Sequence, residues 1–242
     1  MIKDTTLKKR QITWHFVAMY YLVAFAISGL FNSGFLTAYY QALTKGLFIA
    51  DLTYLPAGFG TLIAALFVLR LDKAHIRSIT FLGNAPLRNT AIAIIPLIVF
   101  SIVGLDDGDT TYRYSFALSF AAINLVYATM EEIGWRGYVQ DALRPLAETY
   151  RFVLIGILWW AWHFRFSTAF DFTLFPLICI GGSFLIGKFV EESKSYFTAG
   201  GLHCLVILLS YAGGSTNSKM IAGGLTIAIW LGIGKWWLPK TR

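Results

Sequence analysis

Eight long apolar stretches set the limits on how this chain of 242 residues can fold. A helix needs about 20 apolar residues to cross the hydrocarbon core of a bilayer, and backbone polar groups in lipid must be bonded within the segment. None of the stretches alternates like a barrel strand. We therefore expect an all-α, polytopic membrane protein with about eight transmembrane helices. Residues 1–242 are expected to form a single integral-membrane domain, located in the cell membrane. The stretches cover residues 14–32, 53–69, 91–105, 114–130, 152–170, 173–190, 196–212 and 220–237.

Composition excludes other classes of protein. Hydrophobic residues make up 57% and charged residues 14% of the chain, whereas a soluble domain has about 25% charged residues. The net charge of +7 comes from cations in short loops between apolar stretches, so we expect membrane lipid as a partner and no nucleic acid. Cys179 and Cys204 lie inside apolar stretches and are interpreted as small buried hydrophobes.

The distribution of Lys and Arg predicts the orientation. With an even number of spans and the N-terminus in the cytoplasm, sixteen of the twenty cations fall on the inner side. Cytoplasmic loops are enriched in Lys and Arg, so both termini are expected in the cytoplasm. The four cations left on the outer side are Lys45, Arg113, Arg165 and Lys219.

Five ionisable residues stand within or at the rim of the apolar stretches: Glu131, Glu132, Arg136, His163 and His203. Such residues are costly in a membrane and are candidates for function. If the helix that starts near residue 114 continues to about residue 143, Glu132 and Arg136 are i, i+4 neighbours and can form an ion pair. A solvated cluster at a helix end, and histidines satisfied in a core, are the alternatives.

Glu131 is turned about 100° away from Glu132 on the same helix. It shares its face with Asn124, Tyr127 and Trp135. At about 1.5 Å per residue, Glu131, His163 and His203 lie at comparable depths of about 10–18 Å from the cytoplasmic ends of three helices. We therefore expect one polar pocket that is open to the cell interior.

A carboxylate and two imidazoles can hydrolyse an amide in two ways. The carboxylate can take a proton from water, aided by one imidazole, while the other stabilises the oxyanion. In the alternative, Glu131, His163 and His203 hold a catalytic Zn²⁺, although the chain has no HExxH motif. The sequence alone assigns no cofactor, and zinc stays open as the alternative.

The ordered set Glu131-Glu132-x-x-x-Arg136, Trp159-x-x-x-His163 and His203 resembles the CPBP family of intramembrane proteases. This family includes the CAAX prenyl proteases of the Rce1 type and the bacterial Abi, bacteriocin-immunity-like proteins. The resemblance covers about residues 115–212. It implies that Glu131 activates water with the help of His163, that Glu132 and Arg136 order the site, and that His203 stabilises the oxyanion without a metal. The implied substrate is a peptide or a membrane protein.

Two positions depart from the family pattern. Trp159 stands where the family usually has Phe, and Ile207 stands where it usually has Asn or Asp. The loss of one oxyanion donor can reduce a rate by about 10²–10³, and Asn124 is a candidate substitute. Three functions therefore remain open: an intramembrane endopeptidase, a catalytically weak membrane scaffold or bacteriocin self-immunity protein, and a proton-coupled carrier that uses the Glu and His residues as a relay. The sequence leaves the substrate and the oligomeric state open.

Overall fold

The computed structural model describes residues 11–44, 55–105 and 112–237. These residues form a bundle of helices, and within them the only extended pairing is an isolated parallel bridge between Thr80 and Ser195. The elements are α1 (Trp14–Asn32), α2 (Thr37–Thr44), α3 (Leu55–Leu71), α4 (Pro86–Val103), α5 (Arg113–Gly134), the π-helical segment η2 (Trp135–Gln140), α6 (Glu148–Trp162), α7 (Ala169–Phe172), α8 (Leu174–Ser193), α9 (Tyr196–Ser210) and α10 (Thr216–Trp237).

The all-α, polytopic fold is confirmed in its coarse form. Four helical segments are long and apolar enough to cross a membrane: α1, α4, α5 with η2, and α8. The helices α3 and α9 are apolar but shorter. Each of the eight predicted stretches overlaps a different helix, but eight crossings and cytoplasmic termini stay predictions. Residues 1–10 and 238–242, and the predicted outer cation Lys45, lie outside the described residues.

One predicted boundary is wrong. The stretch 152–170 was expected to be one helix, but α6 ends at Trp162 and its C-cap is His163. The chain then turns at Phe164, which has a positive φ of 55°. The short helix α7 follows, and Thr168 and Asp171 form a capping box at its start. Aromatic residues recur past the turn, at Phe166 and Phe170, which is why hydropathy alone extended the helix.

The predicted extension of the fourth stretch to about Leu143 is borne out. Nothing breaks the helix where the acidic pair occurs, and α5 passes into η2 at Trp135 without leaving helical geometry. π-helical turns are rare and are found mostly at functional sites. The consequence is that Glu132 and Arg136 lie on one continuous helix although the hydrogen-bond pattern changes between them.

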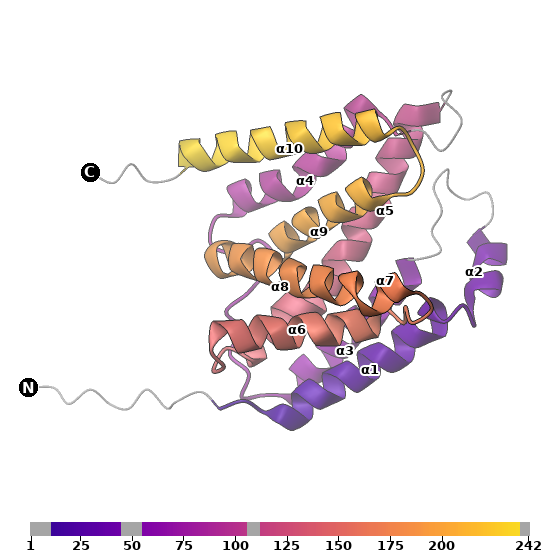
Figure 1. The fold of residues 1–242 in the computed structure, drawn as a ribbon. Coiled ribbons are helices and arrows are strands. Elements are labelled where there is room, and N and C mark those ends of the chain that lie inside the picture. Colours follow the sequence, from indigo (N-terminus) through magenta and orange to yellow (C-terminus); the bar gives the residue numbers. More distant parts are fainter. Residues whose placement is uncertain (1–10, 45–54, 106–111, 238–242) are drawn as a thin grey trace, which may run out of the picture.

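Helix α5 is the central element of the bundle, since it packs against α3, α4 and α9. On one side α1 packs against α3, and α6 packs against α8. Figure 1 shows α4, α6, α8, α9 and α10 running alongside one another, with the start of α1 and the end of α10 on the same side of the bundle. This arrangement brings parts of α5, α6 and α9 together.

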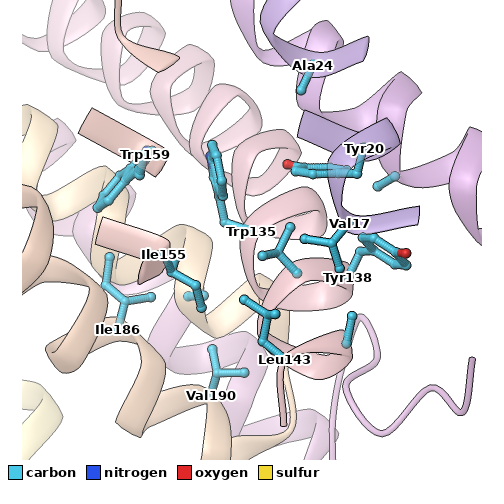
Figure 2. Packing of buried hydrophobic residues seen from close by; sticks show 14 of the residues in the cluster. Val17, Tyr20, Ala24, Trp135, Tyr138, Leu143, Ile155, Trp159, Ile186 and Val190 are labelled. Atoms are coloured by element: carbon cyan, nitrogen blue, oxygen red, sulfur yellow. The ribbon is translucent and has the colours of Figure 1, made fainter. Parts of the chain in front are cut away.

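Two hydrophobic clusters fill the bundle. The first is formed by α1, α3, η2, α6, α8 and α9, and Figure 2 shows part of it around Trp135 and Leu143. The second joins α4, α5, α9 and α10. The buried cysteines Cys179 and Cys204 are free and belong to these clusters, as their sequence context predicted.

Small residues allow the closest helix contacts. A Cβ atom on Gly200 would lie 2.4 Å from the hydroxyl oxygen of Thr129 and 3.0 Å from its Cα, and one on Gly201 would lie 2.5 Å from the Cα of Ala93. Gly200 therefore serves the packing of α9 against α5. The sequence left open whether it instead made room for a substrate, and the structure assigns it to packing.

The segment between α3 and α4 is held against the junction of α8 and α9. Thr80 donates its N–H to the carbonyl of Lys194, and Ser195 donates its hydroxyl to the carbonyl of Phe81 over 2.6 Å. The backbone N–H of Ser78 donates to Asp141, just after η2, over 2.8 Å. These bonds fix one end of α5 and α9 relative to each other.

Candidate active site

The acidic pair of α5 lies inside the protein. Glu131 and Glu132 are both fully buried, although neither has an apolar side chain. The Nε atom of Arg136 lies 2.8 Å from Oε2 of Glu132, and both side chains are inaccessible to solvent. The predicted i, i+4 ion pair therefore forms. Buried charges of this kind need partners, because desolvation costs several kcal/mol per ion.

His203 of α9 provides the second partner of Glu132. Its Nδ1 atom lies 3.0 Å from Oε1 of Glu132. Glu132 is thus held by a cation on its own helix and by an imidazole from a neighbouring helix. With Nδ1 directed at the carboxylate, the Nε2 atom of His203 is the ring nitrogen left for other contacts.

Glu131 has a different partner, which comes from α6. The indole Nε1–H of Trp159 donates a hydrogen bond of 2.9 Å to Oε2 of Glu131. Tyr127, one helical turn before Glu131, lies near the same carboxylate, as its predicted face required. The two neighbouring carboxylates therefore differ: one is paired with charges and the other with hydrogen-bond donors.

His163 lies at the end of α6 and is half-buried. Its Nδ1 atom is 2.7 Å from the carbonyl oxygen of Trp159. Since a carbonyl can only accept, Nδ1 carries the hydrogen, and Nε2 of the neutral ring is free to accept a proton. The His163 ring also packs edge-on against Trp162 and Phe175 at 5.2 and 4.9 Å between centroids.

One indole ring connects these groups. The Trp159 ring lies 5.1 Å from that of His203 and 5.5 Å from that of His163, measured between centroids. The guanidinium carbon of Arg136 stands 5.4 Å above it. The structure therefore brings the predicted residues from α5, α6 and α9 to one place, and Trp159 is the residue that touches most of them. The sequence pointed to Trp159 only as a replacement for Phe, because nothing in the pattern gave the direction of its N–H.

Several buried polar atoms in this region have no hydrogen-bond partner among the described residues. They belong to four side chains and are Oε1 of Glu131, Nη1 and Nη2 of Arg136, Nε1 of Trp162 and the hydroxyl of Tyr20. Tyr20 lies close enough to interact electrostatically with the acidic pair, and Figure 2 shows its ring beside Trp135. An unpartnered buried polar atom costs about 1–3 kcal/mol. Such a gathering is therefore suited to hold water or a polar ligand.

The zinc alternative is not supported by the geometry. Among residues 11–44, 55–105 and 112–237, no three His, Cys, Asp or Glu side chains are grouped to hold a metal ion. Glu131, His163 and His203 thus do not form a ligand set.

The two departures from the family pattern have structural counterparts. Ile207, one turn after His203, is partly buried against the cluster of α4, α5, α9 and α10. Because its side chain is aliphatic, it adds no hydrogen-bond donor. The amide nitrogen of Asn124 donates to the carbonyl of Phe120 on its own helix over 2.8 Å. Asn124 is therefore already engaged, and the expectation that it replaces the missing donor gains no support.

Comparison with known proteins selects the same segment of the chain. Residues 113–209 match the family model described as type II CAAX prenyl endopeptidase Rce1-like. The chain is also 29% identical over 100 residues to CAAX prenyl protease 2 of Methanococcus maripaludis. That match covers 38% of this chain and spans about one third (33%) of the length of the curated relative. The matched segment runs from the start of α5 into α9 and carries every candidate site residue.

Proposed function

We propose that this chain is an intramembrane endopeptidase, because residues 113–209 match the Rce1-like family model and the chain resembles a CAAX prenyl protease. In the proposed reaction, water activated by Glu131 attacks a peptide carbonyl. The observation that carries the proposal is the buried carboxylate of Glu131. One of its oxygens has no hydrogen-bond partner among the described residues, and it stands beside an indole flanked by two imidazoles.

The proposed chemistry begins with a water molecule beside Oε1 of Glu131. The water gives one proton to this oxygen, and its own oxygen forms the new bond to the carbonyl carbon. His163 assists by accepting a hydrogen bond from the water at Nε2. The carbon–nitrogen bond then breaks, and Glu131 passes the proton to the leaving amine. The carboxylate is thereby regenerated.

His203 is the group proposed to stabilise the oxyanion. Glu132 holds its Nδ1 atom, so its protonated ring directs Nε2–H away from the acidic pair. A donor fixed in advance costs no reorganisation when charge develops on the carbonyl oxygen. Arg136 pairs with Glu132 and thereby helps to hold the carboxylate that orients His203.

The second candidate is a membrane scaffold or self-immunity protein with weak or no catalysis. One observation favours it: Ile207 supplies no donor at the family's Asn or Asp position, and Asn124 bonds within its own helix. In this function the same buried cluster would only stabilise the fold.

The test uses purified protein in detergent with a quenched farnesylated CAAX peptide, chosen from the relative's name, and with the same peptide unprenylated. Wild type is expected to cleave one of them, and Glu131→Gln is expected to reduce the rate by about 10²–10⁴. Glu148→Gln, at an exposed ion pair, is the matched control and should retain activity. Equal cleavage by Glu131→Gln contradicts the proposed base, and the absence of cleavage by wild type favours the scaffold.

A further inference from the structure

We infer that Trp159 is a positioning residue that selects which oxygen of Glu131 acts as the base. The inference rests on the proposed function and names how this chain holds its own carboxylate. The indole N–H occupies Oε2 of Glu131 at 2.9 Å. The other oxygen, Oε1, is buried and has no hydrogen-bond partner among the described residues, although the Tyr127 side chain lies near the same carboxylate. A carboxylate fixed at one oxygen presents the other in a constant direction.

The orientation of the indole is itself fixed from several sides. The Arg136 guanidinium covers the ring, and the ring of His203 meets it at an interplanar angle of 90°. Only 6% of Trp159 is exposed. Because the ring cannot turn without moving these groups, the direction of its N–H is determined before substrate arrives.

The same residue also orients His163. Its backbone carbonyl holds the Nδ1–H of His163 at 2.7 Å. Trp159 therefore contacts the proposed base through its side chain and the assisting imidazole through its backbone. A change of the side chain alone separates the two contacts.

A glycine on α8 makes room for the indole. A Cβ atom on Gly182 would lie 3.2 Å from Cζ3 of Trp159 and 3.8 Å from Cη2. Both atoms belong to the six-membered ring of the indole. The Trp159 ring thus packs against α8 at a position that has no side chain.

The kinetic test is Trp159→Phe, which keeps an aromatic ring and removes the N–H. We expect kcat to fall by about 10- to 100-fold, because a hydrogen bond to a charged group contributes about 1.5–3 kcal/mol, while KM changes little. Trp160→Phe is the matched control, since the Trp160 indole donates to the carbonyl of Asp171 outside the acidic pair. This control should retain the wild-type kcat.

A second readout does not depend on activity. In protein labelled with ¹⁵N at the indoles, the resonance missing from Trp159→Phe identifies Trp159. Glu131→Gln should move this resonance upfield, because the acceptor loses its charge, and should leave the Trp160 resonance in place. A ring that only fills space predicts no such movement.

The outcomes separate the two claims. An unmoved Trp159 resonance in Glu131→Gln, or a Trp159→Phe enzyme with wild-type kcat, overturns the positioning role and leaves the protease intact. A wild type that cleaves neither probe defeats the proposed function, and the positioning role with it, even if the resonance still responds to Glu131.

Discussion

At the scale of single residues, the ion pair between Glu132 and Arg136 is costly to break. Both partners are fully inaccessible to solvent and 2.8 Å apart. Removing one partner leaves the other charge buried and uncompensated, which destabilises a protein far more than the loss of an exposed pair. The pair therefore secures the geometry of His203 only as long as both members are present.

The difference in cost between breaking a buried ion pair and breaking an exposed one gives a stability prediction. Glu132→Gln should lower the free energy of unfolding by about 3–5 kcal/mol, measured by denaturant titration in bicelles. The control is Lys188→Met at the pair with Glu148, which has 53% and 42% exposed side chains and should lose less than about 1 kcal/mol. Similar losses in both variants would show that burial does not set the strength of the Glu132 pair.

The sequence predicted some of these contacts and missed others for a geometric reason. Glu132 and Arg136 are one turn apart on one helix, so their pairing follows from helix geometry alone. The bonds from Trp159 to Glu131 and from His203 to Glu132 cross between helices. They depend on how each helix is rotated about its axis, which spacing along the chain does not give.

At the scale of elements, the turn after α6 shows where hydropathy is insufficient. Phe164 and Phe166 keep the segment after Trp162 partly apolar. Thr168 and Asp171 nevertheless satisfy each other's backbone and side-chain groups and begin α7. A Ser or Thr followed three residues later by an acidic residue is a known start signal for a helix. That signal, at Thr168, would have placed His163 at a helix end rather than inside a span.

Asp171 makes this turn sensitive to acid. Hydrogen bonds to its carboxylate, first of all from the Thr168 side chain, hold the pKa of Asp171 below its usual value. A carboxyl group whose folded pKa is depressed stabilises the protein above its unfolded pKa of about 3.9, and this stabilisation is lost as pH falls. The difference in Tm between wild type and Asp171→Asn should therefore be constant above about pH 5 and shrink below about pH 4. A difference that does not change with pH contradicts this role.

The packing of α9 gives a prediction of its own. Gly200→Ala would place a methyl group 2.4 Å from the Thr129 hydroxyl and 3.0 Å from its Cα, so we expect a loss of roughly 1–3 kcal/mol from overpacking. Gly181→Ala on α8 meets nothing within 4 Å and should gain up to about 1 kcal/mol from helix propensity. Thermal unfolding of both variants checks the contrast, and a stable Gly200→Ala protein would contradict the close contact.

At the scale of the whole molecule, the sequence predicted an all-α membrane protein because burial of backbone polar groups in lipid leaves few alternatives. The order of the acidic pair and the two histidines gave the resemblance to the CPBP proteases, and the match of residues 113–209 to the Rce1-like model covers the same residues. Orientation is a different kind of prediction, since it depends on the distribution of cations between loops and not on any internal contact.

Labelling of single cysteines in intact cells tests that orientation. In a background of Cys179→Ala and Cys204→Ala, Ser215→Cys should react with an impermeant maleimide, and Lys73→Cys should react only after the cells are opened. Both positions are exposed, so a lack of reaction is not due to burial. The reverse pattern would place both termini outside the cytoplasm.

The two adjacent glycines of α9 have a consequence for how this helix can move relative to its neighbours. Gly200 is closed off by Thr129 of α5, and Gly201 by the backbone of Ala93 in α4. Neither glycine leaves room for a methyl group between α9 and the neighbouring helix. Because His203 lies on α9, a shift of its ring through movement of this helix would also have to displace Thr129 of α5 or Ala93 of α4.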